Sequence, residues 1–326
     1  MTIALFDLPQ HEARRLLQRG VPAWLCVNPV EYHGPHLSLH NDRVLSLGLI
    51  DAVGARLQAL HDWPIVLADH LELGVDPCAG PGSRPLPFTL VREAVVESCR
   101  ALRELGAERV VLVTFHGAPL HNVALEAGAK WLRAHGVAAI APFHLLLQEM
   151  LTLTDAAPYA DAFVPVADEA ARARVTEQLR FDFHAGFFET SLSLAWAPHT
   201  VSPIHRDLPP CPVYAPDAAL ARAAAGARRL GRESLARELG YGANAIGWSA
   251  LRPFPGYTSE PAIANVESGR IFARHLVERF TPAIDDVLHG RAAPPEPIMP
   301  WVEWMTARGR WPAIARLGAH DVVAPS

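Results

Sequence analysis

Apolar and polar positions alternate in blocks along the first 145 residues. Short, nearly unbroken apolar runs are separated by longer segments in which apolar residues recur every three or four positions. The runs predict strands at 21–27, 64–68, 109–114 and 137–141. The periodic segments predict helices at 9–19, 45–57, 91–105 and 121–135. This order favours an α/β fold with a mainly parallel central sheet that is covered by helices on both faces.

The second half of the chain has a more helical pattern. Its periodicity predicts helices at 168–180, 192–196, 218–239 and 268–280, with a break at 182–191 and an irregular stretch at 202–216. We expect the Pro- and Gly-rich loop at 74–87 and the segment at 152–165 to shape a pocket, because long loops in compact domains tend to be functional. From residue 292 the chain is rich in proline and carries Trp301, Trp304 and Trp311.

Length and composition fit one large domain with additions. Half of the 326 residues are apolar, which is enough for a sizeable core. We expect an α/β domain at 1–290 and a Trp- and Pro-rich tail at 291–326 that packs on the core or on a neighbouring subunit. The formal charge of -5 and the lack of a basic block predict no nucleic-acid partner.

The chain has no signature of export or membrane insertion. Its N-terminus lacks a basic region followed by an apolar one, and no apolar run is long enough to span a bilayer. The four cysteines form no C-x-x-C pair, which argues against a zinc knuckle or a disulfide scaffold. We therefore expect a cytoplasmic protein without membrane contact.

The first group of candidate residues follows the strand at 21–27. Glu31 and His33 are two residues apart, so in an extended backbone they point the same way. Asp42 lies at the start of the next helix and can fold back toward them. Open α/β folds build their sites at this edge, and carboxylates with imidazole suit zinc, manganese or iron. Alternatively, Asp42 is a helix cap.

Two later segments add histidines and a carboxylate. His116 follows the strand at 109–114 next to a glycine, where its ring can face the crevice above the sheet. His184 and Glu189 flank a glycine turn just before a helix. Other interpretations remain open: Glu189 can cap its helix, and a single histidine is more often a surface or hydrogen-bonded core residue than a ligand. In the same way, His36 can simply bond backbone.

Taken together, these segments resemble the motifs of the creatininase (creatinine amidohydrolase) family. The motifs are Glu31-Tyr-His33-Gly-Pro-His36-Leu37 with Asp42, then His116-Gly117-Ala118-Pro119, then His184-Ala-Gly-Phe-Phe-Glu189-Thr-Ser191. They occur in the family's order over residues 21–196. The second motif departs from the family pattern: Pro119 replaces an asparagine, and Ala118 stands where creatininase proper has a glutamate ligand.

The resemblance implies a creatininase-like fold and a binuclear metal site. Glu31, Asp42 and His116 would bind one divalent ion, and His33, Asp42 and Glu189 a second. Asp42 would bridge the ions, and Glu189 would replace the missing glutamate. Zinc is the first expectation, with manganese or iron as alternatives. Two cations held by a shared carboxylate lower the pKa of a bridging water, which makes hydroxide available near neutral pH.

By the same resemblance, the hydroxide attacks an amide carbonyl, His184 passes a proton to the leaving nitrogen, and His36 orients a ligand. The expected activity is hydrolysis of a C–N bond (amide, lactam or formamide) in a small molecule or short peptide. Homo-oligomers, commonly hexamers, are implied as well. The altered second motif leaves an alternative: a metal-depleted relative that acts as a binding or scaffold subunit. A third interpretation is an ordinary α/β protein with scattered histidines.

Overall fold

A parallel sheet forms the centre of the protein. The computed structural model describes residues 2–311 and 315–323. The strands are β1 Ile3–Ala4, β2 Ala23–Val27, β3 Val66–Leu71, β4 Arg109–Val113 and β5 Ala138–Ile140. Their order in the sheet is β1-β3-β2-β4-β5, and every neighbouring pair is parallel. The strands at 21–27, 64–68, 109–114 and 137–141 are thereby confirmed, with ends that shift by up to three residues.

The central strands β2 and β4 are buried on both faces, which explains their continuous apolar sequences. Leu25 and Val27 of β2 belong to one core cluster, whereas Trp24 and Cys26 belong to the other. The alternation follows from the pleat, which points successive side chains to opposite faces. A buried sheet of this kind needs a layer of helices on each side.

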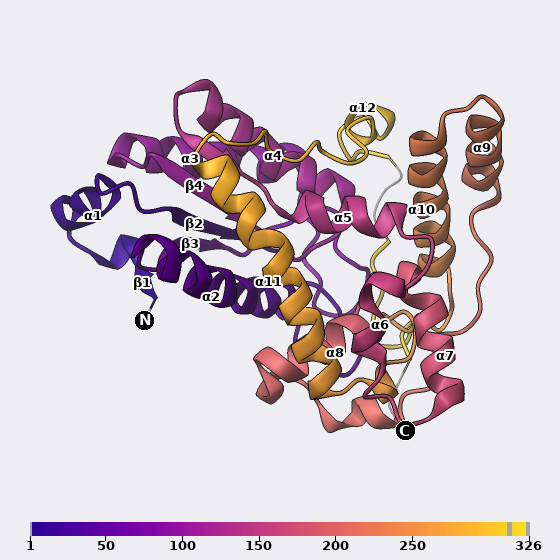
Figure 1. Ribbon diagram of the computed structural model, residues 1–326. Helices are drawn as coiled ribbons and strands as arrows, with labels where there is room; N and C mark the ends of the chain where they lie inside the picture. The colour runs from indigo at the N-terminus through magenta and orange to yellow at the C-terminus, as the bar shows by residue number, and fades with distance from the viewer. Residues whose placement is uncertain (1, 312–314, 324–326) are drawn as a thin grey trace.

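The helices provide these two layers. One face is covered by α1 Gln10–Leu17, α3 Phe88–Leu105 and α4 Pro119–Ala134. The other is covered by α2 Asn41–His61, α5 Phe143–Thr152, α8 Phe187–Trp196 and α11 Val266–Leu288. Figure 1 shows α11 crossing in front of the sheet, with α3 and α4 on the far side. The predicted fold class, a parallel sheet covered by helices on both faces, is confirmed.

Five further helices surround these layers in the described part of the chain. They are α6 Ala160–Phe163, α7 Glu169–Gln178, α9 Ala218–Arg229, α10 Glu233–Ser249 and α12 Val302–Met305. Single 3₁₀ turns lie at Leu5–Asp7, Ala157–Tyr159, Leu179–Phe181, Pro198–Thr200, Pro203–Asp207 and Pro261–Ile263. Within the described ranges, no helix combines the length and the apolar character needed to cross a membrane.

Two predictions from the pattern were wrong in detail, and one helix was not predicted. The helix at 218–239 is two helices, α9 and α10, which run side by side (Figure 1). Gly231 ends α9 with φ +70°, a left-handed conformation that favours glycine. The segment at 182–191 is not broken throughout, because α8 begins at Phe187. Helix α5 was not predicted, since its consecutive leucines at 145–147 hide the helical period.

The tail contacts the core at its beginning. Ile298 and Met299 are buried, and the indole N–H of Trp301 donates a hydrogen bond to Glu238 of α10 (2.6 Å). Trp304 and Trp311 are exposed. The division of the chain at residue 290 stays a prediction.

Candidate metal centre

All six residues expected at the site lie at the carboxyl ends of β2 and β4. Glu31 and His33 follow β2, Asp42 is in the first turn of α2, and His116 follows β4. His184 precedes α8 and Glu189 lies in its first turn. Their nitrogen and oxygen atoms form three overlapping groups, each within 4.8 Å: Glu31–Asp42–His116, His33–Asp42–Glu189 and Glu31–His33–His184. That these side chains bind metal stays a prediction.

The first group centres on His116. Its Nδ1 lies 2.7 Å from Oε2 of Glu31 and 3.5 Å from Oδ2 of Asp42. Its Nε2–H donates to the carbonyl oxygen of Val75 (3.0 Å), a residue of the 74–87 loop. This bond fixes the ring and leaves Nδ1 as the atom that faces the carboxylates, an arrangement typical of metal-binding histidines.

The second group centres on His33 and uses the other oxygen of Asp42. His33 Nε2 lies 3.0 Å from Oδ1 of Asp42 and 3.9 Å from Oε2 of Glu189. Its Nδ1–H donates to the carbonyl oxygen of Glu31 (3.1 Å), so Nε2 faces the carboxylates. Asp42 thus directs one oxygen toward each histidine, which is the arrangement that a bridging carboxylate requires.

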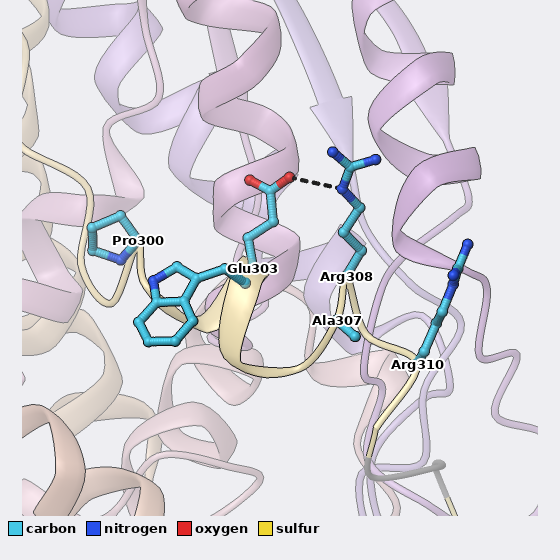
Figure 2. Close-up of a pocket in the computed structure, with 6 residues that line it drawn as sticks. Pro300, Glu303, Ala307, Arg308 and Arg310 are labelled. Atoms are coloured by element: carbon cyan, nitrogen blue, oxygen red, sulfur yellow. Dashed lines mark ion pairs between the residues drawn. The ribbon is translucent and has the colours of Figure 1, made fainter.

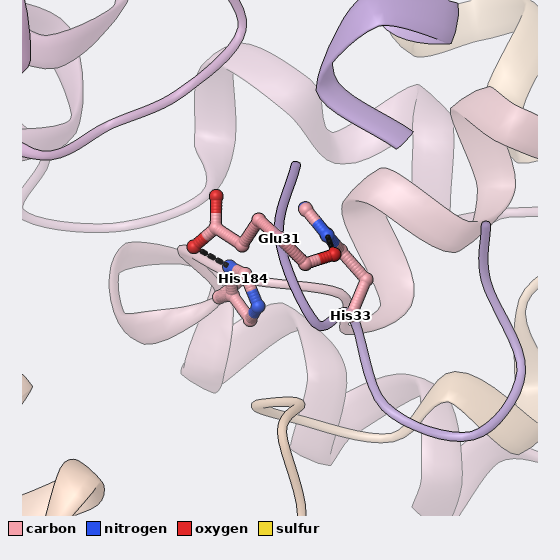
Figure 3. Close-up of side chains that lie close together, drawn as sticks. All are labelled: Glu31, His33 and His184. Carbon is pink, nitrogen blue, oxygen red and sulfur yellow. Dashed lines mark hydrogen bonds and ion pairs between the residues drawn. The ribbon is translucent and has the colours of Figure 1, made fainter. Parts of the chain in front are cut away.

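His184 completes the third group (Figure 3). Its Nε2–H donates to the carbonyl oxygen of Tyr32 (2.9 Å), and its Nδ1 lies 3.8 Å from Oε1 of Glu31. The ring stacks on that of His33, with 4.3 Å between centroids. His184 therefore presents one free nitrogen to the cluster at its edge.

The cluster is buried and carries carboxylate oxygens without partners. Glu31 is 1% exposed and Asp42 2%. Oε2 of Glu31 and Oδ2 of Asp42 accept no hydrogen bond. Within the described ranges, no lysine or arginine forms an ion pair with Glu31, Asp42 or Glu189. Buried carboxylates need compensation, and cations bound by carboxylate and imidazole would provide it here. The residues present therefore fit a metal site.

The pKa values reflect the same concentration of charge. Burial raises the pKa of Glu31, and burial also raises that of Glu189 to about 8. Burial opposes protonation of His33 and His116, but attraction to Asp42 and Glu31 outweighs it and raises their pKa to about 10 and about 9. Burial and the neighbouring His33 hold the pKa of His184 well below its usual range, so that this ring is neutral.

Asn28 holds the two strand ends together. Its Oδ1 accepts hydrogen bonds from the hydroxyl groups of Ser46 and Thr114 (both 3.1 Å) and from the N–H of Phe115 (3.0 Å). The residue was missed from sequence. Its signal was a polar side chain directly after the apolar run of β2.

Asp182 shapes the turn that carries His184 and Glu189, and it was missed too. Its carboxylate accepts hydrogen bonds from the N–H of Phe188 (2.8 Å) and the hydroxyl of Thr258 (3.1 Å). A Cβ at Gly186 would lie 1.9 Å from this carboxylate, so the turn needs glycine there. The bond from Phe188 satisfies one of the first N–H groups of α8, so Asp182 stabilises the start of this helix.

The cap interpretations resolve differently for the two carboxylates. The N-cap of α2 is His40, and Asp42 faces His33 and His116 instead of capping the helix. Oε2 of Glu189 accepts the N–H of Ala185 (2.6 Å) and also faces His33, so this side chain can serve the turn and the cluster together.

His36 lies beside the cluster rather than in it. Its Nε2 and the hydroxyl of Thr190 are 3.0 Å apart. Thr190 follows Glu189, so any effect of His36 on the cluster passes through the start of α8. Burial lowers the pKa of His36 to about 3.

Two other features of the surface differ from this cluster. A hollow of about 430 Å³ lies at the tail. Figure 2 shows two of the residues that line it, Glu303 and Arg308, which form an ion pair (3.6 Å). None of the cluster residues lines it. A further group of His61, Asp285 and His289 lies at the ends of α2 and α11.

A comparison with protein-family models shows to which family the chain belongs. The model described as "Creatininase: Creatinine amidohydrolase" matches residues 7–284. The chain belongs to the creatininase family. The resemblance inferred from the three motifs is confirmed. A comparison with curated proteins gave no match.

Solved creatininase structures have the same fold. A mutant creatininase of Type II is 21% identical, with a TM-score of 0.56, over 88% of this chain and 98% of its own. A mutant creatininase complexed with creatine is also 21% identical, with a TM-score of 0.56, over 88% of this chain and 99% of its own. A putative creatinine amidohydrolase from Bacteroides fragilis is 14% identical, with a TM-score of 0.54, over 82% of this chain and 89% of its own. At these identities the likeness concerns the fold. Family membership and the candidate ligand groups together support a metal-dependent amidohydrolase.

Proposed function

We propose that this creatininase-family protein hydrolyses a C–N bond with two divalent metal ions. Glu31, Asp42 and His116 would hold one ion, and His33, Asp42 and Glu189 the other. The observation that carries the proposal is Asp42: a buried carboxylate whose two oxygens face different histidines and one of which accepts no hydrogen bond. Zinc is the first candidate, with manganese or iron as alternatives. One related structure is described as "Creatininase Mn" and another as Zn-Zn type.

The chain's own residues would bind and orient the reactants. When bound, the two ions supply Lewis acidity, which polarises a carbonyl oxygen and lowers the pKa of a water molecule. The hydrogen bonds from His116 to Val75 and from His33 to Glu31 keep the ligand nitrogens facing inward. His184, with its Nδ1 at the edge of the cluster, would be the group that passes a proton to the leaving nitrogen.

The proposed substrate is a small molecule or a short peptide that carries an amide, lactam or formamide group. Creatine occupies one of the related structures. In this chain Ala118 and Pro119 replace two residues of the family's second motif. We propose a homo-oligomer as well, on the strength of the family resemblance.

The alternative, a metal-depleted binding or scaffold subunit, is not favoured. Without metal, the buried carboxylates of Glu31 and Asp42 would depend on His33 and His116 for counter-charge, and one oxygen of each would accept no hydrogen bond. A scaffold protein would gain stability by replacing them with apolar residues.

Elemental analysis of protein purified without chelator tests the proposal, with wild type beside Asp42→Ala. We expect about two equivalents of a transition metal per subunit in the wild type and almost none in the variant, because Asp42 is shared by both groups. Asp285→Ala, which removes a carboxylate from the other group at the far end of α2, is the matched control and should keep both equivalents. A wild type that is folded, metal-free and not reloadable would reject the proposal.

A further inference from the structure

An apolar cavity lies directly beside Glu189. It has a volume of about 40 Å³ and also borders Gly117, the neighbour of His116. Its walls come from three segments outside the cluster: α5 with Leu146, Leu147 and Met150, α10 with Tyr241, and the tail with Ile298. The cavity therefore connects the candidate metal centre to a set of apolar side chains.

Two carboxylates, those of Asp182 and Glu189, also line this cavity, and three of their four oxygens accept hydrogen bonds. Both oxygens of Asp182 accept hydrogen bonds, from Phe188 and Thr258. One oxygen of Glu189 accepts the N–H of Ala185. A negatively charged group placed among the leucines would lose its hydration and lie beside the carboxylate of Glu189, so the cavity selects against anions.

The volume suits a small alkyl group. A cavity needs roughly 10–15 Å³ of such volume to hold one water molecule, and this one is about three times larger. Its leucine, methionine and isoleucine walls favour methyl or methylene groups, each of which gains about fourfold in affinity when fully buried.

We infer that the cavity is a specificity subsite for a branched alkyl group attached to the scissile amide. The inference rests on the proposed function and names its substrate class: a neutral amide with an apolar substituent beside the carbonyl. In the reaction, the oxygen of water forms a bond to the carbonyl carbon and the C–N bond breaks. The leaving nitrogen takes a proton, and the products are a carboxylic acid and an amine.

Gly117 offers a precise way to fill the cavity. A Cβ at this position would lie 3.7 Å from Leu147 Cδ2 and 3.8 Å from the hydroxyl of Tyr241, which are ordinary van der Waals distances. The φ of Gly117 is not in the left-handed region. Gly117→Ala should therefore fold and place one methyl group where the substrate's alkyl group would bind.

The test measures binding of two hydroxamic acids, which chelate divalent metals through both oxygens, to the metal-loaded protein by titration calorimetry. Isobutyrohydroxamic acid has two more carbons than acetohydroxamic acid, and we expect it to bind roughly tenfold more tightly. Gly117→Ala should reduce that ratio to about two, because its methyl group takes the same space. Met150→Ala enlarges the cavity and should improve binding of benzohydroxamic acid by a factor of roughly five. Leu230→Ala, at an exposed site after α9, should leave the ratio unchanged.

The outcomes separate this inference from the proposed function. If acetohydroxamic acid binds to the wild type but the isobutyro compound binds no more tightly, the subsite is refuted while the metal centre stands. If neither binds and no metal is present, the proposed function fails and the subsite with it. If Gly117→Ala loses its metal, Met150→Ala still decides: no gain for benzohydroxamic acid rejects the subsite.

Discussion

Helix α2 carries a carboxylate–histidine group at each of its ends. Asp42 in its first turn belongs to the candidate metal centre, and His61, its last residue, belongs to the group with Asp285 and His289. Asp285 Oδ1 lies 2.6 Å from His61 Nε2 and 3.0 Å from His289 Nδ1, while its Oδ2 pairs with Arg291 (2.5 Å). Both groups thus combine the same residue types at similar distances.

The two groups differ in burial and in what their oxygens already bind. The side chain of Asp285 is 15% exposed and every oxygen has a donor, one of them a guanidinium. Asp42 is 2% exposed, no arginine or lysine is paired with it within the described ranges, and its Oδ2 has no hydrogen bond. Composition alone therefore does not define a metal site. We expect metal at the group in which a buried carboxylate oxygen has no hydrogen-bond partner, and none at the group of Asp285, whose oxygens are already paired.

Replacing one histidine in each group should give the largest contrast. His184→Gln is expected to lower kcat by roughly 10²–10⁴-fold, because the protein loses the group proposed to transfer a proton to the leaving nitrogen. His289→Gln, the matched control, should leave kcat unchanged. Elemental analysis accompanies the kinetics, and both variants should keep their metal. Loss of metal from His184→Gln would instead make His184 a ligand, which its proximity to Glu31 and His33 permits.

Removal of metal should destabilise the protein through the Asp42 group and not through the Asp285 group. Extraction with a chelator is expected to lower the free energy of unfolding by about 3 kcal/mol, because ions bound to the folded state alone stabilise it by that amount at roughly a hundred times their Kd. Urea titration with and without chelator measures the change.

Two variants serve as controls for the chelator experiment. Asp285→Ala should respond to the chelator as the wild type does, whereas Asp42→Ala should not respond. A wild type whose stability is the same with and without chelator would contradict the assignment of Glu31 and Asp42 to a metal centre.

The sequence predicted the sheet and the cluster because both depend on local patterns. Buried parallel strands need apolar runs, so β2 and β4 were visible, and their carboxyl ends placed Glu31 and His116 at one edge. His184 and Glu189 were found because their motif resembles that of a family. The direction of each ring nitrogen was not accessible, since it depends on carbonyl groups such as that of Val75, 41 residues before His116.

What the sequence did not predict depends on contacts between distant segments. Asn28 bonds to Thr114, and Asp182 bonds to Thr258, and no periodicity marks such residues. The apolar cavity combines α5, α10 and Ile298 of the tail, so it exists only after the chain has folded. Residues 152–165 do not line this cavity, whereas the residues of α5 just before them, such as Met150, do, and the expectation that 152–165 shapes the substrate pocket stays a prediction.

The smallest expected effect is the pH dependence of the free energy of unfolding that comes from Asp285. Burial works against ionisation of Asp285, but hydrogen bonds from His61 and Arg291 outweigh it and lower its pKa below the ordinary value of 3.8. A carboxyl with a lowered pKa stabilises the folded state fully above its unfolded pKa, and the contribution disappears as the pH falls through the folded pKa. The wild type should therefore exceed Asp285→Asn in free energy of unfolding by about 1 kcal/mol or less at about pH 6, since solvent screens the pair. Urea titrations should show this margin shrinking below about pH 4. A margin that instead grows with acid would mean that Asp285 is not ionised in the network, and the distinction between the two ends of α2 would have to rest on burial alone.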